Sequence, residues 1–303
     1  MDMRDHSNLN DGYTYRETIA GSASGRPLDR YLAETYAHST LALWQERIAE
    51  GRVLLDGRRG EPDELLRFGQ VLEWHRPPWE EPDAPLHFAL LHEDAQVLVI
   101  DKPAGLPTMP GGGFLQHTLV HQLRLIHPDA SPMHRLGRWT SGAVLCARGP
   151  AAGAHIAAQF AARSITKHYR ALASGCPELD RFEVTVPIGP VPYAPLGTLH
   201  AASPAGRPAL SSVEVIDRRD QAFLCDVRIA TGRPHQIRVH LAAAGHPLVG
   251  DPLYRAGGLP DPAGTALPGD PGYHLHAAEL GFEHPDGSRV VVRAHVPEAL
   301  RKP

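Results

Sequence analysis

The stretch His134-Arg135-Leu136-Gly137-Arg138-Trp139-Thr140-Ser141-Gly142 decides how this chain is interpreted. An unbroken apolar run, residues 143–147, follows it at once and has the length of a buried strand. Two fixed positive charges, Arg135 and Arg138, stand in the stretch, and it contains no carboxylate. The pattern predicts a positively charged loop that leads directly into a strand of the core.

Length and composition place the chain among ordinary globular proteins. Its 303 residues allow one main core and a smaller module. Hydrophobic residues make up 42% and charged residues 21%, and no stretch approaches the roughly 18 apolar residues of a membrane span. The polar amino terminus contains no secretory signal, so we expect a cytoplasmic protein. We also expect a monomer. Cys146, Cys176 and Cys225 are too few and too scattered for a disulfide framework, so we expect reduced, buried side chains.

The distribution of charge matters more than the net value of −4, which by itself argues against a nucleic-acid binder. Residues 130–177 contain no Asp or Glu and carry six fixed positive charges. The six are Arg135, Arg138, Arg148, Arg163, Lys167 and Arg170. Such a local basic field suits phosphate contacts, although a general preference for arginine over lysine explains the same counts equally well.

The chain divides into four segments by composition and periodicity. We expect a disordered lead-in over residues 1–15, a small α/β module over 16–76, a proline-rich linker over 77–85 and the main domain over 86–303. Within the main domain the patterns predict helices and strands in alternation. The helices are predicted at 118–126, 151–163 and 234–244, and the strands at 95–100, 143–147 and 165–172.

Three further motifs accompany the stretch at 134–142. They are residues 100–106 (IDKPAGL), 230–240 (ATGRPHQIRVH) and 245–254 (GHPLVGDPLY). In this order they resemble the RluA-type RNA pseudouridine synthases over residues 90–295. The resemblance implies an α+β fold with a mixed, largely antiparallel sheet and flanking helices, and an isomerase that converts uridine to pseudouridine in ribosomal or transfer RNA. Residues 16–76 resemble an S4-type RNA-binding domain, for which a generic small helical cap is the alternative.

The resemblance also implies which residues form the site. The family has a nucleophilic Asp on the loop, a Tyr as candidate proton acceptor and an Arg paired to the carboxylate, which correspond here to Gly137, Tyr169 and Arg238. Residues expected to contact RNA are Arg135, Arg138, Lys102, Lys167, Arg233, His235 and Gln236. Because the reaction is redox-neutral and the pattern has no ligand cluster, we expect no cofactor and no metal.

Gly137 leaves the chemistry open, because glycine has no side chain that could act as nucleophile or base. Another carboxylate could enter the space, and the candidates are Asp101, Asp226, Asp251 and Glu279. Alternatively, the protein is a catalytically silent RNA-binding protein that uses the same cleft, or the fold serves a different reaction. A buried Arg238 without a partner would cost about 3–5 kcal/mol. We therefore expect a carboxylate or a bound anion at its guanidinium group.

Overall fold

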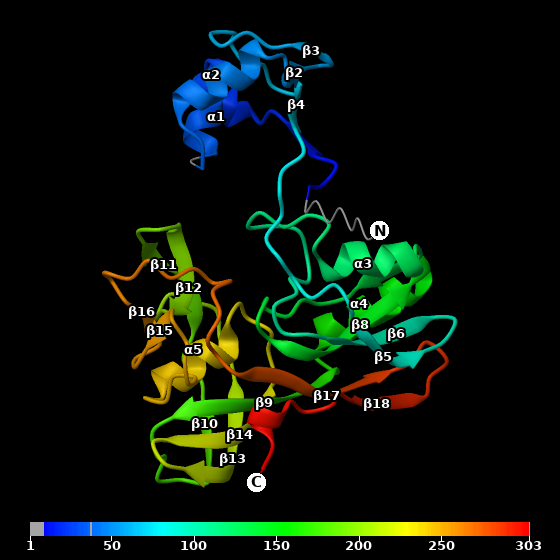
Figure 1. Cartoon of the computed structure of the whole chain (residues 1–303), viewed down its shortest axis with the longest axis vertical. Coiled ribbons are helices and arrows are strands. Elements are labelled where there is room, and N and C mark those ends of the chain that lie inside the picture. The colour runs from blue at the N-terminus through cyan, green and yellow to red at the C-terminus, as the bar shows by residue number, and fades with distance from the viewer. Residues whose placement is uncertain (1–8, 37, 303) are drawn as a thin grey trace, which may run out of the picture. The chain divides into compact units, whose positions relative to one another are not determined.

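The computed structural model describes residues 9–36 and 38–302. The chain forms two compact units, Met1–Glu81 and Pro82–Pro303, and the boundary falls inside the proline-rich segment 77–85 (Figure 1). Within the described ranges, none of the helices is both long enough and apolar enough to span a membrane.

The first unit packs two helices against a small sheet. Its elements are β1 (Tyr13–Thr18), η1 (Gly21–Ala23), α1 (Leu28–Thr35), α2 (Leu41–Ala49), β2 (Val53–Leu55), β3 (Arg58–Arg59) and β4 (Val71–Arg76). The sheet is antiparallel with the order β1-β4-β2-β3. Leu32 of α1 and Trp44 and Ile48 of α2 are buried against Val53 and Leu72, so the apolar spacing that predicts two short helices also marks their buried faces.

The predicted lead-in needs a correction. Its first part, residues 1–8, lies outside the described residues, but residues 13–15 belong to β1, which pairs with β4 over its full length. The ring of Tyr15 also stacks on Trp74 with centroids 5.0 Å apart. Tyr and Thr favour strands, so the alternating run from Tyr13 to Thr18 is a strand signal that the prediction of disorder overlooked.

The second unit is built around one large sheet. Its strands are β5 (Ala89–Glu93), β6 (Val97–Lys102), β7 (Ala130–Pro132), β8 (Ser141–Arg148), β9 (Thr166–Ser174), β10 (Arg181–Val184), β13 (Ser211–Arg219), β14 (Ala222–Ile229), β17 (Leu275–Glu283) and β18 (Arg289–Arg293). The order is β10-β13-β14-β9-β17-β8-β6-β5, with β18 on β17 and β7 on β8. The neighbours β8 and β17 run parallel and the other pairs run antiparallel. The predicted α+β fold with a mixed, largely antiparallel sheet is confirmed.

Helices cover both faces of this sheet, which explains the unbroken apolar runs in β6 and β8. Remaining elements are α3 (Leu119–Ile126), α4 (Gly149–Ala162), β11 (Ile188–Tyr193), β12 (Gly197–Ala202), α5 (Gln236–Ala243), β15 (Tyr254–Arg255), β16 (Leu259–Pro260) and η2 (Glu298–Leu300). Alternate side chains of β8 enter different clusters: Val144 joins α3 and α5, whereas Leu145 joins Ile156 of α4. Both neighbours are therefore buried, and strict alternation of polar and apolar residues is absent.

Two local predictions differ from the structure. The helix expected from Pro234 starts at Gln236, because His235 adopts the left-handed conformation (φ 53°, ψ 22°) and turns the chain before the first helical turn. Cys146 and Cys225 are buried as predicted, but Cys176 is exposed. It follows Gly175, which has a positive φ, in the connection after β9, so it lies in a surface turn and not in the core.

Gly142 fixes how the stretch at 134–142 joins the sheet. It pairs with Ala277 where β8 and β17 run parallel, its φ is +105°, and a Cβ atom there would lie 2.3 Å from the backbone oxygen of Ala277. We expect Gly142→Ala to lower the free energy of unfolding by more than about 3 kcal/mol, because strain and a backbone clash combine. Urea unfolding measures the loss.

The matched control is Gly153→Ala, in the interior of α4, where a Cβ atom meets nothing within 4 Å. Removing backbone freedom there is expected to stabilise the protein by about 0.5–1 kcal/mol. Equal unfolding midpoints for the two variants would contradict the close approach of β8 and β17.

Candidate active site beneath the signature loop

Residues 134–142, here called the signature loop, connect β7 to β8 and are fastened to the turn that follows β6. Nζ of Lys102 donates a hydrogen bond to the carbonyl oxygen of Arg138 at 3.1 Å. It also donates to the carbonyl oxygens of Pro103 and Leu106, at 2.8 and 2.7 Å. The backbone N–H of Gly105 reaches the same Arg138 oxygen at 2.8 Å. These hydrogen bonds therefore hold the motifs at residues 100–106 and 134–142 together.

The predicted RNA contacts of Lys102 and Gln236 are corrected by this placement. Lys102 is fully buried, its three hydrogen bonds go to backbone oxygens, and burial lowers the pKa of its amine to about 7. Gln236 is also buried: its Nε2 donates to the carbonyl oxygen of Leu210, and its Oε1 accepts from Oγ1 of Thr231 and the N–H of Arg233. Both side chains hold loops in place, which leaves them no free group for RNA.

Gly137 is exposed on the signature loop and faces two hydroxyl groups. A Cβ atom at this position would lie 2.9 Å from the hydroxyl oxygen of Tyr273 and 3.4 Å from Oγ1 of Thr140. The two oxygens are themselves 3.4 Å apart. Apart from the residues adjoining Gly137, no other heavy atom of the described chain comes within 4 Å of that point. The space in which a side chain at 137 would begin is thus bordered by hydroxyls and by no carboxylate.

Arg238 has the anionic partner that its burial requires. It lies on α5 and is 2% exposed, and its Nε and Nη2 donate to the two carboxylate oxygens of Asp251 at 2.7 and 2.8 Å. Its Nη1 donates to the carbonyl oxygen of Pro268 at 3.1 Å. Asp251 in turn accepts backbone N–H bonds from Leu253 and Tyr254. The predicted carboxylate at the Arg238 guanidinium is confirmed, and the geometry is the bidentate one that is strongest for this pair.

Two tyrosine rings enclose the same guanidinium. Its Cζ lies 4.2 Å from the ring centroid of Tyr273 and 5.1 Å from that of Tyr254, within the range of cation–π attraction. Tyr273 comes from the segment just before β17 and is 5% exposed. One ring therefore contacts Arg238 with its face while its hydroxyl reaches Gly137. Tyr273 joins the buried ion pair to the signature loop.

The four candidate carboxylates do not fill the space at Gly137. Asp251 is held by Arg238, and its side chain has no exposed surface. Asp226 pairs with Arg170 at 2.7 Å, and Glu279 pairs with Arg293 at the same distance. Asp101 lies on β6, where it pairs in register with Ala143, and burial raises the pKa of its carboxyl group. The hypothesis that a displaced carboxylate replaces the family's Asp at this point is not supported.

Tyr169 lies under the loop as part of the core. It is 8% exposed on β9 and belongs to the same buried cluster as Leu136 and Tyr273. Burial raises the pKa of its hydroxyl to about 12, so the group is protonated at neutral pH. In this state the hydroxyl can donate a hydrogen bond, whereas accepting a proton would first require an unfavourable ionisation.

The remaining predicted RNA contacts differ in how freely they can move. Arg135 is exposed, Arg233 and Lys167 are half-buried, and the Nε of Arg233 donates to the carbonyl oxygen of Pro208 at 3.2 Å. Arg138 is more constrained, because its Nε donates to the carbonyl oxygen of Gly105 at 3.0 Å and its guanidinium lies over the ring of Phe114. The signature loop therefore presents one unconstrained arginine, Arg135, and one arginine that stabilises the loop itself.

His235 lies directly before α5. Its Nδ1 is 2.6 Å from the hydroxyl oxygen of Tyr254. Burial, assisted by the charges of Arg238 and Arg135, lowers the pKa of the imidazole to about 3. His235 is therefore neutral at physiological pH, and it can contact RNA by hydrogen bonding but not as a cation.

The basic field of residues 130–177 is weaker in the structure than in the sequence. Arg148 lies 3.1 Å from a carboxylate oxygen of Asp129 and 3.4 Å from one of Glu93, and Arg170 pairs with Asp226. Carboxylates from other segments thus neutralise two of the six charges. Arg135, two residues before Gly137, is exposed, whereas the guanidinium of Arg138 is held by the carbonyl oxygen of Gly105.

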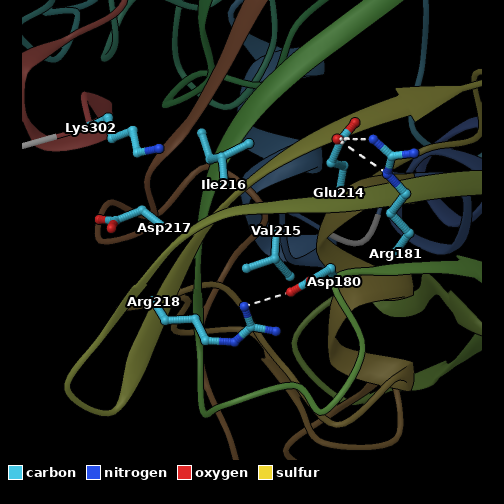
Figure 2. A pocket seen from close by; sticks show the side chains of 8 residues that line it. All are labelled: Asp180, Arg181, Glu214, Val215, Ile216, Asp217, Arg218 and Lys302. Atoms are coloured by element: carbon cyan, nitrogen blue, oxygen red, sulfur yellow. Dashed lines mark hydrogen bonds and ion pairs between the residues drawn. The ribbon is translucent and has the colours of Figure 1, made fainter.

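The two described cavities lie elsewhere. The larger, of about 710 Å³, lies beside β10 and β13 and is shown in Figure 2. Its charged groups face one another as the pairs Arg181–Glu214 and Arg218–Asp180, so it offers no excess of positive charge. The smaller, of about 480 Å³, is bordered mainly by apolar residues of β11 and the segment 259–262. Neither cavity is lined by residues 135, 169 or 238.

Sequence reasoning missed Tyr273 and Thr140. Thr140 stands within the quoted motif, but its hydroxyl gains a role only through Tyr273, which lies 133 residues further along the chain. Tyr273 follows a loop rich in proline and glycine and has no periodic pattern around it. The sequence indicates Tyr273 only indirectly, because a buried Arg238 and a missing side chain at residue 137 require some other group between them.

Comparisons with known proteins agree with this architecture. A family model described as RNA pseudouridylate synthase matches residues 96–243, which include the signature loop and α5. An uncharacterised RNA pseudouridine synthase of Synechocystis sp. is 44% identical over 259 residues, covering 85% of this chain and 89% of the relative. The ribosomal large subunit pseudouridine synthase D of Xanthomonas campestris is 35% identical over 305 residues, covering 94% and 89%. The solved structure of human RNA pseudouridylate synthase domain containing 1 matches with a TM-score of 0.58 at 26% identity, covering 72% of this chain and 86% of that one.

The buried pair gives a prediction about stability. Asp251→Asn leaves the Arg238 charge buried without an anion, so we expect a loss of about 3–5 kcal/mol in the free energy of unfolding. The double variant Arg238→Met/Asp251→Asn has no charge left at this pair and is expected to recover part of that loss. Glu214→Gln, which breaks an exposed pair with Arg181, is the control and should cost less than about 1 kcal/mol. Similar losses for Asp251→Asn and Glu214→Gln would contradict the assignment.

Three histidines around the site predict how stability depends on pH. Burial lowers the pKa of His134 and of His276 to about 4, and that of His235 to about 3. Between these values and pH 6.5 the unfolded chain binds protons that the folded protein does not, so stability falls as pH falls. Each such histidine contributes up to about 1.4 kcal/mol per pH unit.

The measurement is urea unfolding from pH 7 to pH 4.5, in the wild type and in His134→Gln. The variant should show a shallower decline, because one of the three groups no longer titrates. His87→Gln, at an exposed histidine, is the matched control. A slope that is the same in all three proteins would show that burial of His134 does not govern its protonation.

Proposed function

Because the chain belongs to the RNA pseudouridylate synthase family, a family of isomerases, we propose that it converts uridine to pseudouridine in structured RNA, either ribosomal or transfer RNA. The observation that carries this proposal is that Arg238, paired with Asp251, lies under the signature loop. At that loop, the exposed Gly137 faces two hydroxyl groups. The relative from Xanthomonas is named for the large ribosomal subunit, which supports ribosomal RNA as the first substrate to test.

The reaction places definite demands on the site. The bond between C1′ and N1 must break, the base must rotate without leaving, and C5 must join C1′. The target nucleotide has to be flipped out of its stack, which costs a few kcal/mol, and a cation in the vacated space offsets part of that cost. Arg135 is exposed on the signature loop and suits this role. Tyr169 can hydrogen-bond the flipped base, and the isomerisation needs no cofactor because it is redox-neutral.

A second candidate function is a catalytically silent RNA-binding protein that uses the same cleft. The observation in its favour is the absence of a carboxylate near Gly137 among the residues that the structure describes. Loss of a catalytic nucleophile reduces rates by factors on the order of 10⁴–10⁶ in other enzymes. Binding requires only the arginines of the loop and the shape of the site, which a glycine at 137 does not disturb.

The first unit is proposed to be an S4-like RNA-binding module in a monomeric cytoplasmic protein. Several of its arginines are paired with carboxylates, as in Arg16–Glu73 and Arg58–Glu64, which lowers the positive charge available to phosphates. Tyr13 and Tyr15 on β1 are 48% and 42% exposed, and aromatic faces can stack on unpaired bases. We propose that this unit adds affinity and does not take part in chemistry.

The proposed activity is measured by tritium release. Transcripts of ribosomal and transfer RNA, labelled at C5 of uracil, should lose label to water when incubated with the protein, because joining C5 to C1′ expels that hydrogen. Arg135→Ala should slow release, since nothing then fills the gap left by the flipped nucleotide. Arg124→Ala, an exposed arginine on α3, is the control. Binding of RNA without release from any transcript would favour the silent protein.

A further inference from the structure

The hydroxyl group of Tyr273 lies directly beside the place where the side chain of residue 137 would begin. It lies 2.9 Å from the Cβ position of Gly137, closer than two such atoms normally approach, so an ordinary side chain at 137 and this hydroxyl exclude one another. The ring behind it is 5% exposed and belongs to the main buried cluster, which fixes its direction. The missing side chain of Gly137 and the hydroxyl of Tyr273 therefore meet at one exposed position of the signature loop.

The surroundings of this hydroxyl suit an oxygen that carries negative charge for part of a reaction. The Arg238 guanidinium lies 4.2 Å from the centre of the same ring, so its positive charge is close to any charge on the phenol. Oγ1 of Thr140 lies 3.4 Å from the phenol oxygen and can donate to it. A preorganised cation and donor of this kind stabilise developing charge without rearrangement.

Tyr254 shows that this environment is particular to Tyr273. Its ring also contacts Arg238, but its hydroxyl donates to the carbonyl oxygen of His200 at 2.6 Å and lies 2.6 Å from Nδ1 of His235. That hydroxyl is committed to two strong contacts. The phenol oxygen of Tyr273 has one long contact, to Thr140, and adjoins an exposed position of the loop.

We propose that Tyr273 is the catalytic residue of this protein and that its phenol oxygen performs the reaction step for which residue 137 has no side chain. The inference rests on the proposed function. It differs from the hypothesis of a displaced carboxylate, since the oxygen comes from a tyrosine held by the buried arginine.

The chemistry balances without a co-reactant. The phenol oxygen attacks C1′ of the flipped uridine as the C1′–N1 bond breaks, and the phenol proton passes to the departing uracil. The base then rotates, C5 attacks C1′, and the bond from C1′ to the tyrosine oxygen breaks. The phenolate takes the C5 proton and is regenerated as a phenol, and the proton on the uracil stays with the product. Nothing is oxidised or reduced, and label from C5 reaches water by exchange from the hydroxyl group.

The test is Tyr273→Phe, which keeps the ring against Arg238 and removes one oxygen atom. We expect single-turnover tritium release from the labelled transcripts to fall by a factor on the order of 10³ or more, with RNA affinity and thermal stability unchanged. Tyr193→Phe is the matched control, because it removes another buried tyrosine hydroxyl, which donates to the carbonyl oxygen of Ala266 and does not come within 4 Å of the Cβ position of Gly137. It should release label at the wild-type rate.

A second pair of variants separates chemistry from packing. Gly137→Asp alone should be inactive, because its Cβ atom would lie 2.9 Å from the Tyr273 hydroxyl and displace it. Gly137→Asp/Tyr273→Phe frees that space and restores an oxygen nucleophile, so it should regain release above the level of Tyr273→Phe. A residue that only fills space would give the opposite order, with Tyr273→Phe active.

The outcomes distinguish the two proposals. Wild-type protein that releases label, together with a Tyr273→Phe variant that releases it equally fast, overturns the role of Tyr273 and leaves the proposed function intact. Wild-type protein that binds the transcripts but releases nothing overturns both. Loss of release in Tyr273→Phe, with binding retained and with recovery in the double variant, supports the inference.

Discussion

The buried ion pair of Arg238 and Asp251 is the constraint on which the site depends. A guanidinium group that is 2% exposed must have an anion and must satisfy its N–H donors, and here two of its nitrogens go to Asp251 and a third to the carbonyl of Pro268. These contacts fix α5 against the segment around residue 251 and against the loop before Tyr273. The planar faces of the guanidinium are left for aromatic rings, which explains its contacts with Tyr273 and Tyr254.

Because Asp251 already neutralises Arg238, the signature loop is not required to supply a carboxylate. One anion balances the Arg238 charge, so the fold does not need a carboxylate at residue 137. A side chain at 137 would come within 2.9 Å of the Tyr273 hydroxyl, so it would displace that group. The glycine and the tyrosine therefore belong to one arrangement, in which the loop contributes space and the segment before β17 contributes the polar atom.

The sequence predicts the large-scale structure well and the centre of the site poorly, for a physical reason. Strands such as β8 and helices such as α3 depend on short-range periodicity and capping, and Thr118, directly before α3, does accept the N–H of His121. The partner of Arg238 could be foreseen because burying a lone charge is costly. Tyr273 could not, since its meeting with Gly137 depends on the register of β17 beside β8. The charge of Lys102 suggests a contact with phosphate, but the burial of this side chain argues against such a contact.

A site that carries hydroxyls at this point has consequences for binding as well as for chemistry. RNA is strongly anionic, and a carboxylate at residue 137 would repel the phosphates that Arg135 and Arg138 attract. With hydroxyls in its place, no negative charge at residue 137 opposes the attraction between Arg135 and the phosphates. The same glycine that removes the expected nucleophile thus favours association. Affinity for RNA is therefore compatible with an isomerase and with a silent binder, and the fate of the C5 hydrogen is the property in which the two differ.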